Sequence, residues 1–227
     1  MDVNKFYEIL KQKNNKYNND PELIKMLIEY KGKEGHEKIQ KELFKELIGK
    51  YLKLTKKLDQ KIEQITRLAE TDQLTKIYNR VKFKEELEKE IKRVKRYGND
   101  LALIMIDIDH FKNVNDIFGH NFGDKVLIEM TNIVSNSIRE TDIFARWGGE
   151  EFMVLTPNTS LSFAKKLAER VRKNIEKNKI KKIGQITCSF GVTKFIEKDD
   201  FDSFTKRVDD ALYQAKEDGR NRVVDKY

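Results

Sequence analysis

The chain has 227 residues, of which 37% are charged and 38% hydrophobic, with a formal net charge of +8. This length suits one ordinary domain and a smaller appendage, and the hydrophobic share is enough for a core, which excludes wholesale disorder. The longest apolar run, residues 101–106, is far too short to cross a bilayer, and residues 1–20 lack the apolar centre of a signal peptide. We therefore expect no membrane span.

The balance of charges says little about partners. Lysine and arginine outnumber aspartate and glutamate by 46 to 38, which suits anionic ligands. Lysines and glutamates alternate along most of the predicted helices, however, and pairing on solvated helix faces explains that pattern. We expect no nucleic-acid partner. The single cysteine, Cys188, lies in the apolar run 186–190 and predicts a buried thiol in a reducing cytoplasm.

Residues 1–70 are predicted to form an N-terminal helical segment, and residues 71–227 a separate domain. Pro21 fits the first turn of a helix with Asp20 as its cap, and residues 31–35 are the expected break between helices. The long helix that follows carries a heptad register, formed by Phe44, Ile48, Tyr51, Thr55, Leu58, Ile62, Ile65 and Ala69. Two interpretations remain open: a dimerisation stalk, or an amphipathic helix packed on its own domain.

Strands and helices alternate after Thr71. The hydrophobic pattern predicts helices that end near Tyr97 and cover 122–138, 162–177 and 204–217, and strands at 101–108, 143–147, 151–155, 185–195 and 223–224. This order is ferredoxin-like, an α/β (α+β) domain whose sheet contains antiparallel strands, with helices packed on one face.

Two acidic motifs follow strand ends. Asp107 and Asp109 close the most apolar strand and lie two positions apart, so they project from the same side. Glu150 and Glu151 follow the glycine pair 148–149, where one strand turns into another. If those strands are neighbours, Asp107 and Glu150 converge, and converging carboxylates suit Mg²⁺. The alternative is a pair of unrelated acidic surface turns.

Five motifs in this order resemble the GGDEF-domain diguanylate cyclases. They cover roughly residues 69–227 and read DQLTKIYNR (72–80), DIDHFKNVND (107–116), GH with GD (119–120 and 123–124), RWGGEEF (146–152) and ALYQAK with GRN (211–216 and 219–221). The chain has Glu150 where many members have aspartate, and Lys76 where glycine is frequent. The resemblance implies a nucleotidyl-cyclase domain that condenses two GTP molecules into cyclic di-GMP and releases pyrophosphate.

The resemblance also implies roles for individual residues. Asp107, the backbone carbonyl of Ile108, and Glu150 match the ligands of Mg²⁺, for which Mn²⁺ is able to substitute. Glu150 also matches the carboxylate that helps to deprotonate the attacking 3′-hydroxyl, and Lys112 matches a lysine that stabilises charge in the transition state.

The remaining positions match residues that bind the substrate or the product. Lys216 and Arg220 match the groups that hold the terminal phosphates, Asn115 and Asp124 match the pair that reads the guanine edge, and His120 helps to shape that pocket. The pattern of acceptors favours GTP over ATP. Arg139 and Asp142 match an RxxD inhibitory site for cyclic di-GMP; the alternative there is an ordinary polar helix end.

Each site of this family holds one GTP, so the resemblance implies a homodimer in which two domains face each other. Two rival functions remain: a catalytically inactive receptor that binds cyclic di-GMP through Arg139 and Asp142, and a helical scaffold with a vestigial domain. Retention of Asp107 and Glu150 favours an active enzyme over both.

Overall fold

The computed structural model describes residues 37–227, with side chains described from residue 48 onward apart from Arg67. The helix start predicted at Pro21 and the break predicted at 31–35 lie outside these residues. The chain divides into two compact units, Met1–Lys61 and Ile62–Tyr227. The domain boundary expected after residue 70 stays a prediction. In the described part of the chain, no helix is both long enough and apolar enough to span a membrane.

Helix α3 (Glu37–Glu70) carries the predicted heptad register. Along it, Tyr51 is 41% exposed, Leu58 55%, Ile62 49% and Ile65 63%. Three leucines outside the predicted register, Leu52, Leu54 and Leu68, are also exposed and widen the apolar stripe. An apolar stripe left open to water is typical of a helix that pairs with a second helix.

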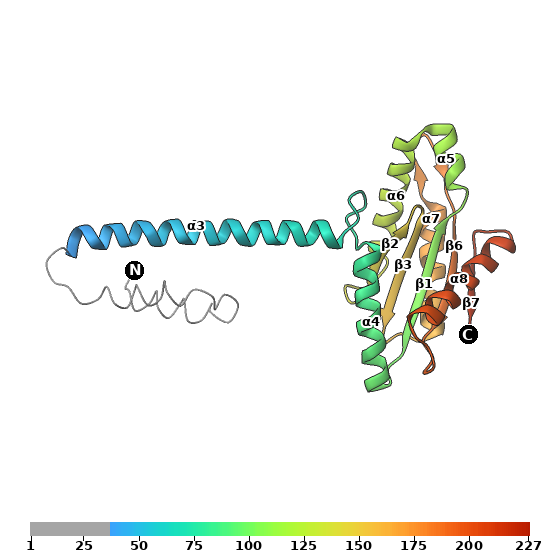
Figure 1. Cartoon of the computed structure of the whole chain (residues 1–227). Coiled ribbons are helices and arrows are strands. Elements are labelled where there is room, and N and C mark those ends of the chain that lie inside the picture. Colours follow the sequence, from blue (N-terminus) through green and yellow to red (C-terminus); the bar gives the residue numbers. More distant parts are fainter. Residues whose placement is uncertain (1–36) are drawn as a thin grey trace. The chain divides into compact units, whose positions relative to one another are not determined.

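A five-stranded sheet forms the centre of the second unit (Figure 1). The spatial order is β2-β3-β1-β6-β7; the β1–β3, β1–β6 and β2–β3 pairs are antiparallel, and β6–β7 is parallel. The strands are β1 (Leu101–Ile108), β2 (Ile143–Gly148), β3 (Glu151–Pro157), β6 (Cys188–Lys194) and β7 (Val223–Lys226). The predicted mixed sheet and its central apolar strand are confirmed.

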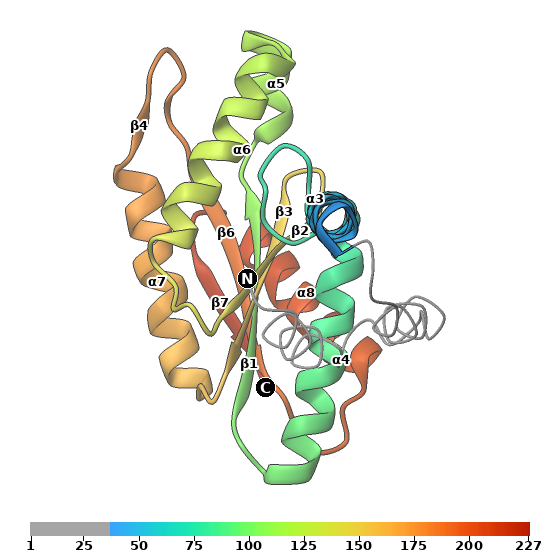
Figure 2. The ribbon, with the colours of Figure 1, turned by 90° about the vertical axis from the view of Figure 1, so that its left-hand side faces the viewer.

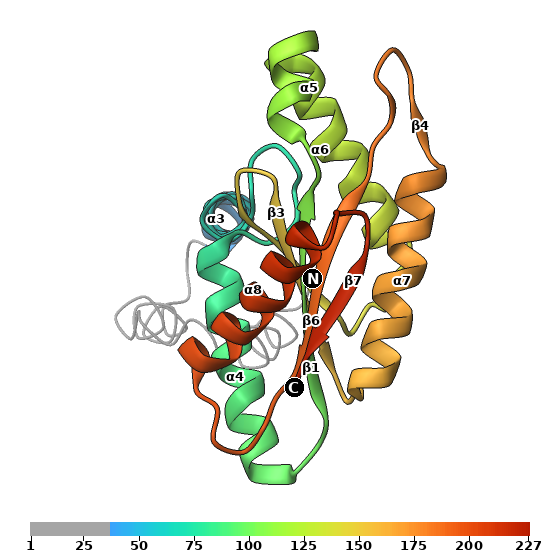
Figure 3. The ribbon, with the colours of Figure 1, turned by 90° about the vertical axis from the view of Figure 1, so that its right-hand side faces the viewer.

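Helices cover both faces of this sheet, so the prediction of a single covered face is wrong. Helices α6 (His120–Ser135) and α7 (Leu161–Lys177) lie on one side, and α4 (Arg80–Tyr97) and α8 (Phe201–Glu217) on the other (Figures 2 and 3). The physical reason is β1, in which all eight residues are buried. A strand that is buried on both faces needs a layer on each.

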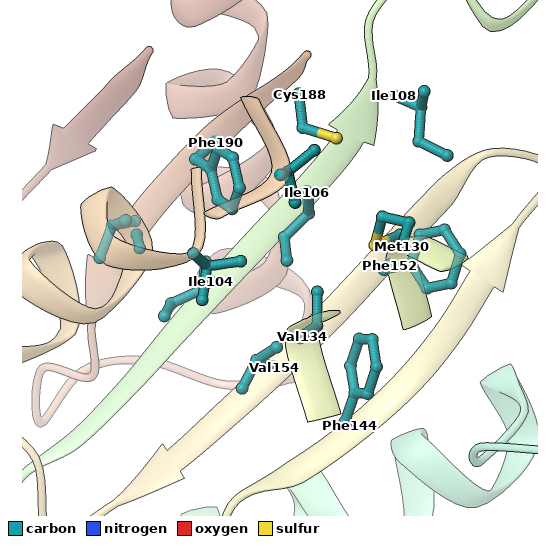
Figure 4. Close-up of a cluster of buried hydrophobic side chains, with 14 of the residues drawn as sticks. Ile104, Ile106, Ile108, Met130, Val134, Phe144, Phe152, Val154, Cys188 and Phe190 are labelled. Carbon is teal, nitrogen blue, oxygen red and sulfur yellow. The ribbon is translucent and has the colours of Figure 1, made fainter. Parts of the chain in front are cut away.

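The side chains of β1 alternate between the two resulting cores. Ile104, Ile106 and Ile108 join the cluster beneath α6 and α7, which also holds Cys188 (Figure 4). Leu101, Leu103 and Met105 join the cluster beneath α4 and α8. Asp107 continues this second series and therefore lies on the α8 side of the strand. Cys188 is buried as predicted, and its burial raises the pKa of the thiol.

Three short elements were not predicted. Helix α5 (Phe111–Phe118) has only eight residues, and the two-residue strands β4 (Lys179–Ile180) and β5 (Gly184–Gln185) form a separate hairpin. The strand expected at 185–195 is shorter than predicted, because β6 begins at Cys188 and Gln185 belongs to the hairpin. Elements this short show too few repeats for hydrophobic periodicity to reveal them.

Candidate active site

The site is built at the end of β1. Asp107 is buried and lies in register with Glu151 of β3 and Ser189 of β6. Helix α8 brings Lys216 to within 2.8 Å of the Asp107 carboxylate. Burial raises the pKa of Asp107 to about 6; the ion pair with Lys216 opposes this shift, and the charges of Glu150 and Glu151 add to it. Acidic groups therefore do converge here from two strand ends.

The β2–β3 turn holds the second acidic motif. Gly149 has a φ of +35°, and a bulge lies between Arg146 and Gly148. The N–H of Ile108 donates to the carbonyl of Glu150 at 3.4 Å, which ties the turn to the end of β1. Burial also raises the pKa of Glu151, against the opposing charge of Lys216.

Arg146 links this turn to Asp72, in the segment that follows α3. Its guanidinium donates to the carbonyl of Gly149 at 3.0 and 2.7 Å and to the carboxylate of Asp72 at 3.2 and 3.3 Å. Asp72 in turn accepts from the backbone and hydroxyl of Thr75 at 2.8 and 2.7 Å. The motif that follows α3 is therefore bonded directly to the glycine turn. No sequence pattern predicted this role of Arg146.

The chemistry of the donors fits a hard cation shared with a ligand. Asp107, Glu150 and Glu151 supply carboxylates at one end of the sheet. Burial, and to a smaller extent the two glutamates, raises the pKa of Asp107, and a bound cation would favour its ionised form. No group of three or more acidic, histidine or cysteine side chains suited to a metal occurs among the residues described. Mg²⁺ needs only one or two carboxylates, because phosphate oxygens and water complete its shell.

Asp109 does not belong to this acidic group. Its carboxylate is buried and accepts from the hydroxyls of Thr187 and Ser189, each at 2.7 Å, and from the N–H of Asn221 at 3.0 Å. Asp109 therefore does not join Asp107 in the acidic group, because Thr187, Ser189 and Asn221 supply enough donors to satisfy its buried carboxylate.

The predicted guanine-binding residues come from α5 and α6, which meet at Gly119. A methyl group on Gly123 of α6 would lie 2.0 Å from the amide oxygen of Asn115 on α5. The absence of a side chain at Gly123 thus lets Asn115 lie against the backbone next to Asp124. Lys112, His120 and Asp124 are exposed on these two helices.

Arg139 and Asp142 lie apart from the acidic group, next to a cavity of about 240 Å³. The N–H of Arg139 donates to Asp142 Oδ2 at 2.9 Å, whereas Oδ1 is buried and has no hydrogen-bond partner among the described residues. Burial raises the pKa of Asp142 against the opposing hydrogen bond and charge of Arg139. The cavity is also lined by Lys166 and Arg170 of α7, which sequence spacing did not connect to the motif.

Comparison with known proteins agrees with this arrangement. A family profile described as "Diguanylate cyclase, GGDEF domain" matches residues 69–222. The chain belongs to the GGDEF family of diguanylate cyclases. Its acidic turn, GGEEF in this sequence, is the motif for which the family is named, with glutamate at the third position.

The GGDEF region is also similar to individual proteins. Diguanylate cyclase DgcM of Escherichia coli (strain K12) is 40% identical over 162 residues, which are 71% of this chain and 40% of that protein. The chain thus spans less than half of that relative.

Two solved structures cover more of the chain. The coiled coil and GGDEF domain of DgcB from Caulobacter crescentus, in complex with c-di-GMP, has a TM-score of 0.77 and 30% identity, covering 81% of this chain and 99% of that one. Diguanylate cyclase SiaD from Pseudomonas aeruginosa, in complex with its activator SiaC, has a TM-score of 0.67 and 30% identity, covering 98% and 90%.

Proposed function

We propose that this chain is a diguanylate cyclase that condenses two GTP molecules into cyclic di-GMP and acts in the cytoplasm. The convergence of Asp107 with the Glu150–Glu151 turn carries the proposal, because both lie at one end of the sheet beside the cation Lys216. The retention of carboxylates at both strand ends favours an active enzyme over an inactive receptor. The family of the chain supports the same activity.

The metal in this proposal is Mg²⁺, with Mn²⁺ able to substitute. Asp107, Glu150 and the carbonyl of Ile108 would hold it, and when bound it supplies positive charge beside the phosphates of GTP. Lys216 and Arg220 would bind the terminal phosphates, and Lys112 would offset the charge that develops in the transition state. The carboxylate of Asp124 would accept hydrogen bonds from the ring N–H and amino group of guanine, and the amide of Asn115 would bind the same edge, with His120 at the pocket wall.

The reaction joins two half-sites. The 3′-oxygen of one GTP attacks the α-phosphorus of the other, the bond from that phosphorus to the β-phosphate bridging oxygen breaks, and pyrophosphate leaves. Glu150 takes the proton of the 3′-hydroxyl. The 3′-oxygen of the second nucleotide then attacks the α-phosphorus of the first in the same way, which closes the ring and releases a second pyrophosphate. The proposal therefore requires two domains that face each other.

Helix α3 supports a homodimer. Its exposed stripe, which includes Leu58, Ile62 and Ile65, suits a parallel pair with a second copy. Replacing Ile65 with aspartate should yield a monomer in sedimentation. Turnover at the same protein concentration should fall by about a hundredfold or more, because the two GTP-bound domains would have to meet by diffusion. A fully active monomer would exclude this part of the proposal.

Product inhibition at Arg139 and Asp142 completes the proposal. The buried and unpartnered Oδ1 atom of Asp142, beside two arginines and a lysine at one cavity, suits guanine and phosphate groups together.

The activity is tested by incubating the chain with GTP and Mg²⁺ and separating the nucleotides by chromatography. We expect cyclic di-GMP and pyrophosphate, no dinucleotide from ATP, and no product after EDTA is added. If no cyclic di-GMP forms at concentrations that populate the dimer while cyclic di-GMP still binds, the chain is a receptor.

A further inference from the structure

The turn between α8 and β7 has an unusual backbone. Gly219, Arg220 and Asn221 have φ values of 110°, 62° and 45°, so three consecutive residues adopt left-handed conformations. Residues other than glycine adopt this region at a cost, and Asn tolerates it better than Arg does. Such a turn persists only where surrounding contacts hold it.

Asn221 supplies those contacts. Its N–H donates to Asp109 Oδ2 at 3.0 Å, its Oδ1 accepts from Arg172 Nη1 at 2.7 Å, and its Nδ2 donates to Glu176 Oε1 at 2.7 Å. The backbone is thus tied to the end of β1, and both ends of the side-chain amide are tied to α7.

The partners of Asn221 are themselves fixed. The side chain of Arg172 is held in place by two glutamates of the same helix. Its guanidinium donates to Glu169 at 2.9 and 2.8 Å and to Glu176 at 3.1 Å. Asp109 is buried among the hydroxyls of Thr187 and Ser189. The anchor therefore consists of ordered groups from three elements of the fold.

Arg220 is the residue that this anchor places. Its N–H donates to the carbonyl of Ala215 at 3.0 Å and its carbonyl accepts from Arg222 Nε at 3.1 Å, so its backbone is fixed on both sides. Its side chain is exposed, and its guanidinium has no hydrogen bond or ion pair with the residues that the structure describes. The turn lies at the same end of the sheet as the end of β1 (Figure 3), where Lys216 reaches Asp107.

We propose that Asn221 and Arg172 are positioning residues, which hold Arg220 where its guanidinium meets the triphosphate of the bound nucleotide. This inference rests on the proposed function of Arg220 as a phosphate ligand. An arginine on an unanchored turn would have to be ordered on binding, at the expense of affinity.

The test compares Asn221→Gly with Arg220→Ala and the double variant. Glycine keeps the left-handed backbone accessible and removes only the amide contacts. The ligand is the GTP analogue with a methylene bridge between the α- and β-phosphorus, which cannot release pyrophosphate, and binding is measured by calorimetry with Mg²⁺. Each single variant should weaken binding by about tenfold, the loss expected for one charge-assisted hydrogen bond. The double variant should bind within about twofold of Arg220→Ala, because Asn221 acts through Arg220.

Lys173→Ala is the matched control. Lys173 lies on α7 next to Arg172 and pairs with Glu169 at 3.6 Å, so its loss should change affinity by less than about twofold. A thermal melt followed by Trp147, the one tryptophan of the sequence, verifies folding. If Asn221→Gly does not fold, Arg172→Lys replaces it, with a smaller loss of affinity and the same dependence on Arg220.

The inference is overturned if folded Asn221→Gly binds the analogue as the unaltered chain does, or if the losses multiply in the double variant. Unaltered binding by Arg220→Ala overturns the phosphate assignment together with the anchor. Because the measurement is binding, a chain that binds the analogue but makes no cyclic di-GMP would refute the proposed activity and still decide the role of Asn221.

Discussion

The Nζ atom of Lys216 lies 2.8 Å from Oδ2 of Asp107, so helix α8 delivers a cation to the buried acid at the end of β1. That cation is not sufficient to offset burial and the nearby glutamates, since the pKa of Asp107 remains raised to about 6. The end of β1 is therefore short of positive charge when no divalent cation is bound.

This shortage predicts a pH-dependent stability in EDTA. The pKa of Asp107 in the folded chain lies above its ordinary value of 3.8, so the folded state holds this proton more tightly than the unfolded state does. This group therefore lowers the stability of the fold as the pH rises from about 4 to about 6. Asp107→Asn should thus be more stable than the unaltered chain at pH 7.5, by as much as about 3 kcal/mol, and equal to it near pH 4. Urea denaturation at several pH values measures the difference. Equal stability of Asp107→Asn and the unaltered chain at pH 7.5 would show that ionised Asp107 does not destabilise the fold.

Gly123→Ala should impair GTP binding. Its new methyl group would lie 2.0 Å from the amide oxygen of Asn115, so Asn115 or α5 must move. We expect the KM for GTP to rise by about tenfold or more, with a loss of about 1–3 kcal/mol in the free energy of unfolding. Gly49→Ala is the control, because its methyl group would meet nothing within 4 Å. An unchanged KM for Gly123→Ala would mean that Asn115 does not contact the base.

Lys76→Gly should stabilise the fold. Lys76 has a φ of 62°, which explains why glycine is frequent at this position of the family motif. Relief of the left-handed conformation should exceed the entropic cost of glycine and raise the free energy of unfolding by about 0.5–1 kcal/mol. Chemical denaturation measures this gain, and a loss of stability would indicate that the Lys76 side chain makes compensating contacts.

Arg139→Ala should relieve product inhibition. The cavity beside Asp142 would lose one of its two arginines, so cyclic di-GMP should bind about tenfold or more weakly, while the initial rate stays unchanged. Progress curves with added cyclic di-GMP test this expectation. Undiminished inhibition would favour the interpretation of the motif as an ordinary polar helix end.

The sequence indicated the long helix, the central strand and the two acidic motifs because each has a strong local pattern. The buried strand 101–108 and the turn before Glu150 are examples. The prediction of helices on only one face is wrong. The apolar run of β1 already indicates a layer on each face, since the strand has no polar face that water could cover.

Other parts of the site depend on contacts between distant residues. The spacing of Asp107 and Asp109 predicts that both side chains project from the same side of the strand. It does not reveal the hydroxyls of Thr187 and Ser189, some eighty positions away, which bind Asp109. The bond from Arg146 to Asp72 and the approach of Arg170 to Asp142 likewise arise only when separate elements pack. Single-sequence patterns contain no record of such pairs.

Glu150→Gln provides the most direct test of the central claim, that acids from two strand ends support GTP condensation. The formation of cyclic di-GMP should fall by at least about a hundredfold, because the variant loses a metal ligand and the proton acceptor, while binding of cyclic di-GMP is retained. Glu88→Gln, an exposed change on α4, should leave turnover unaltered. Undiminished turnover by Glu150→Gln would contradict the assignment of the site.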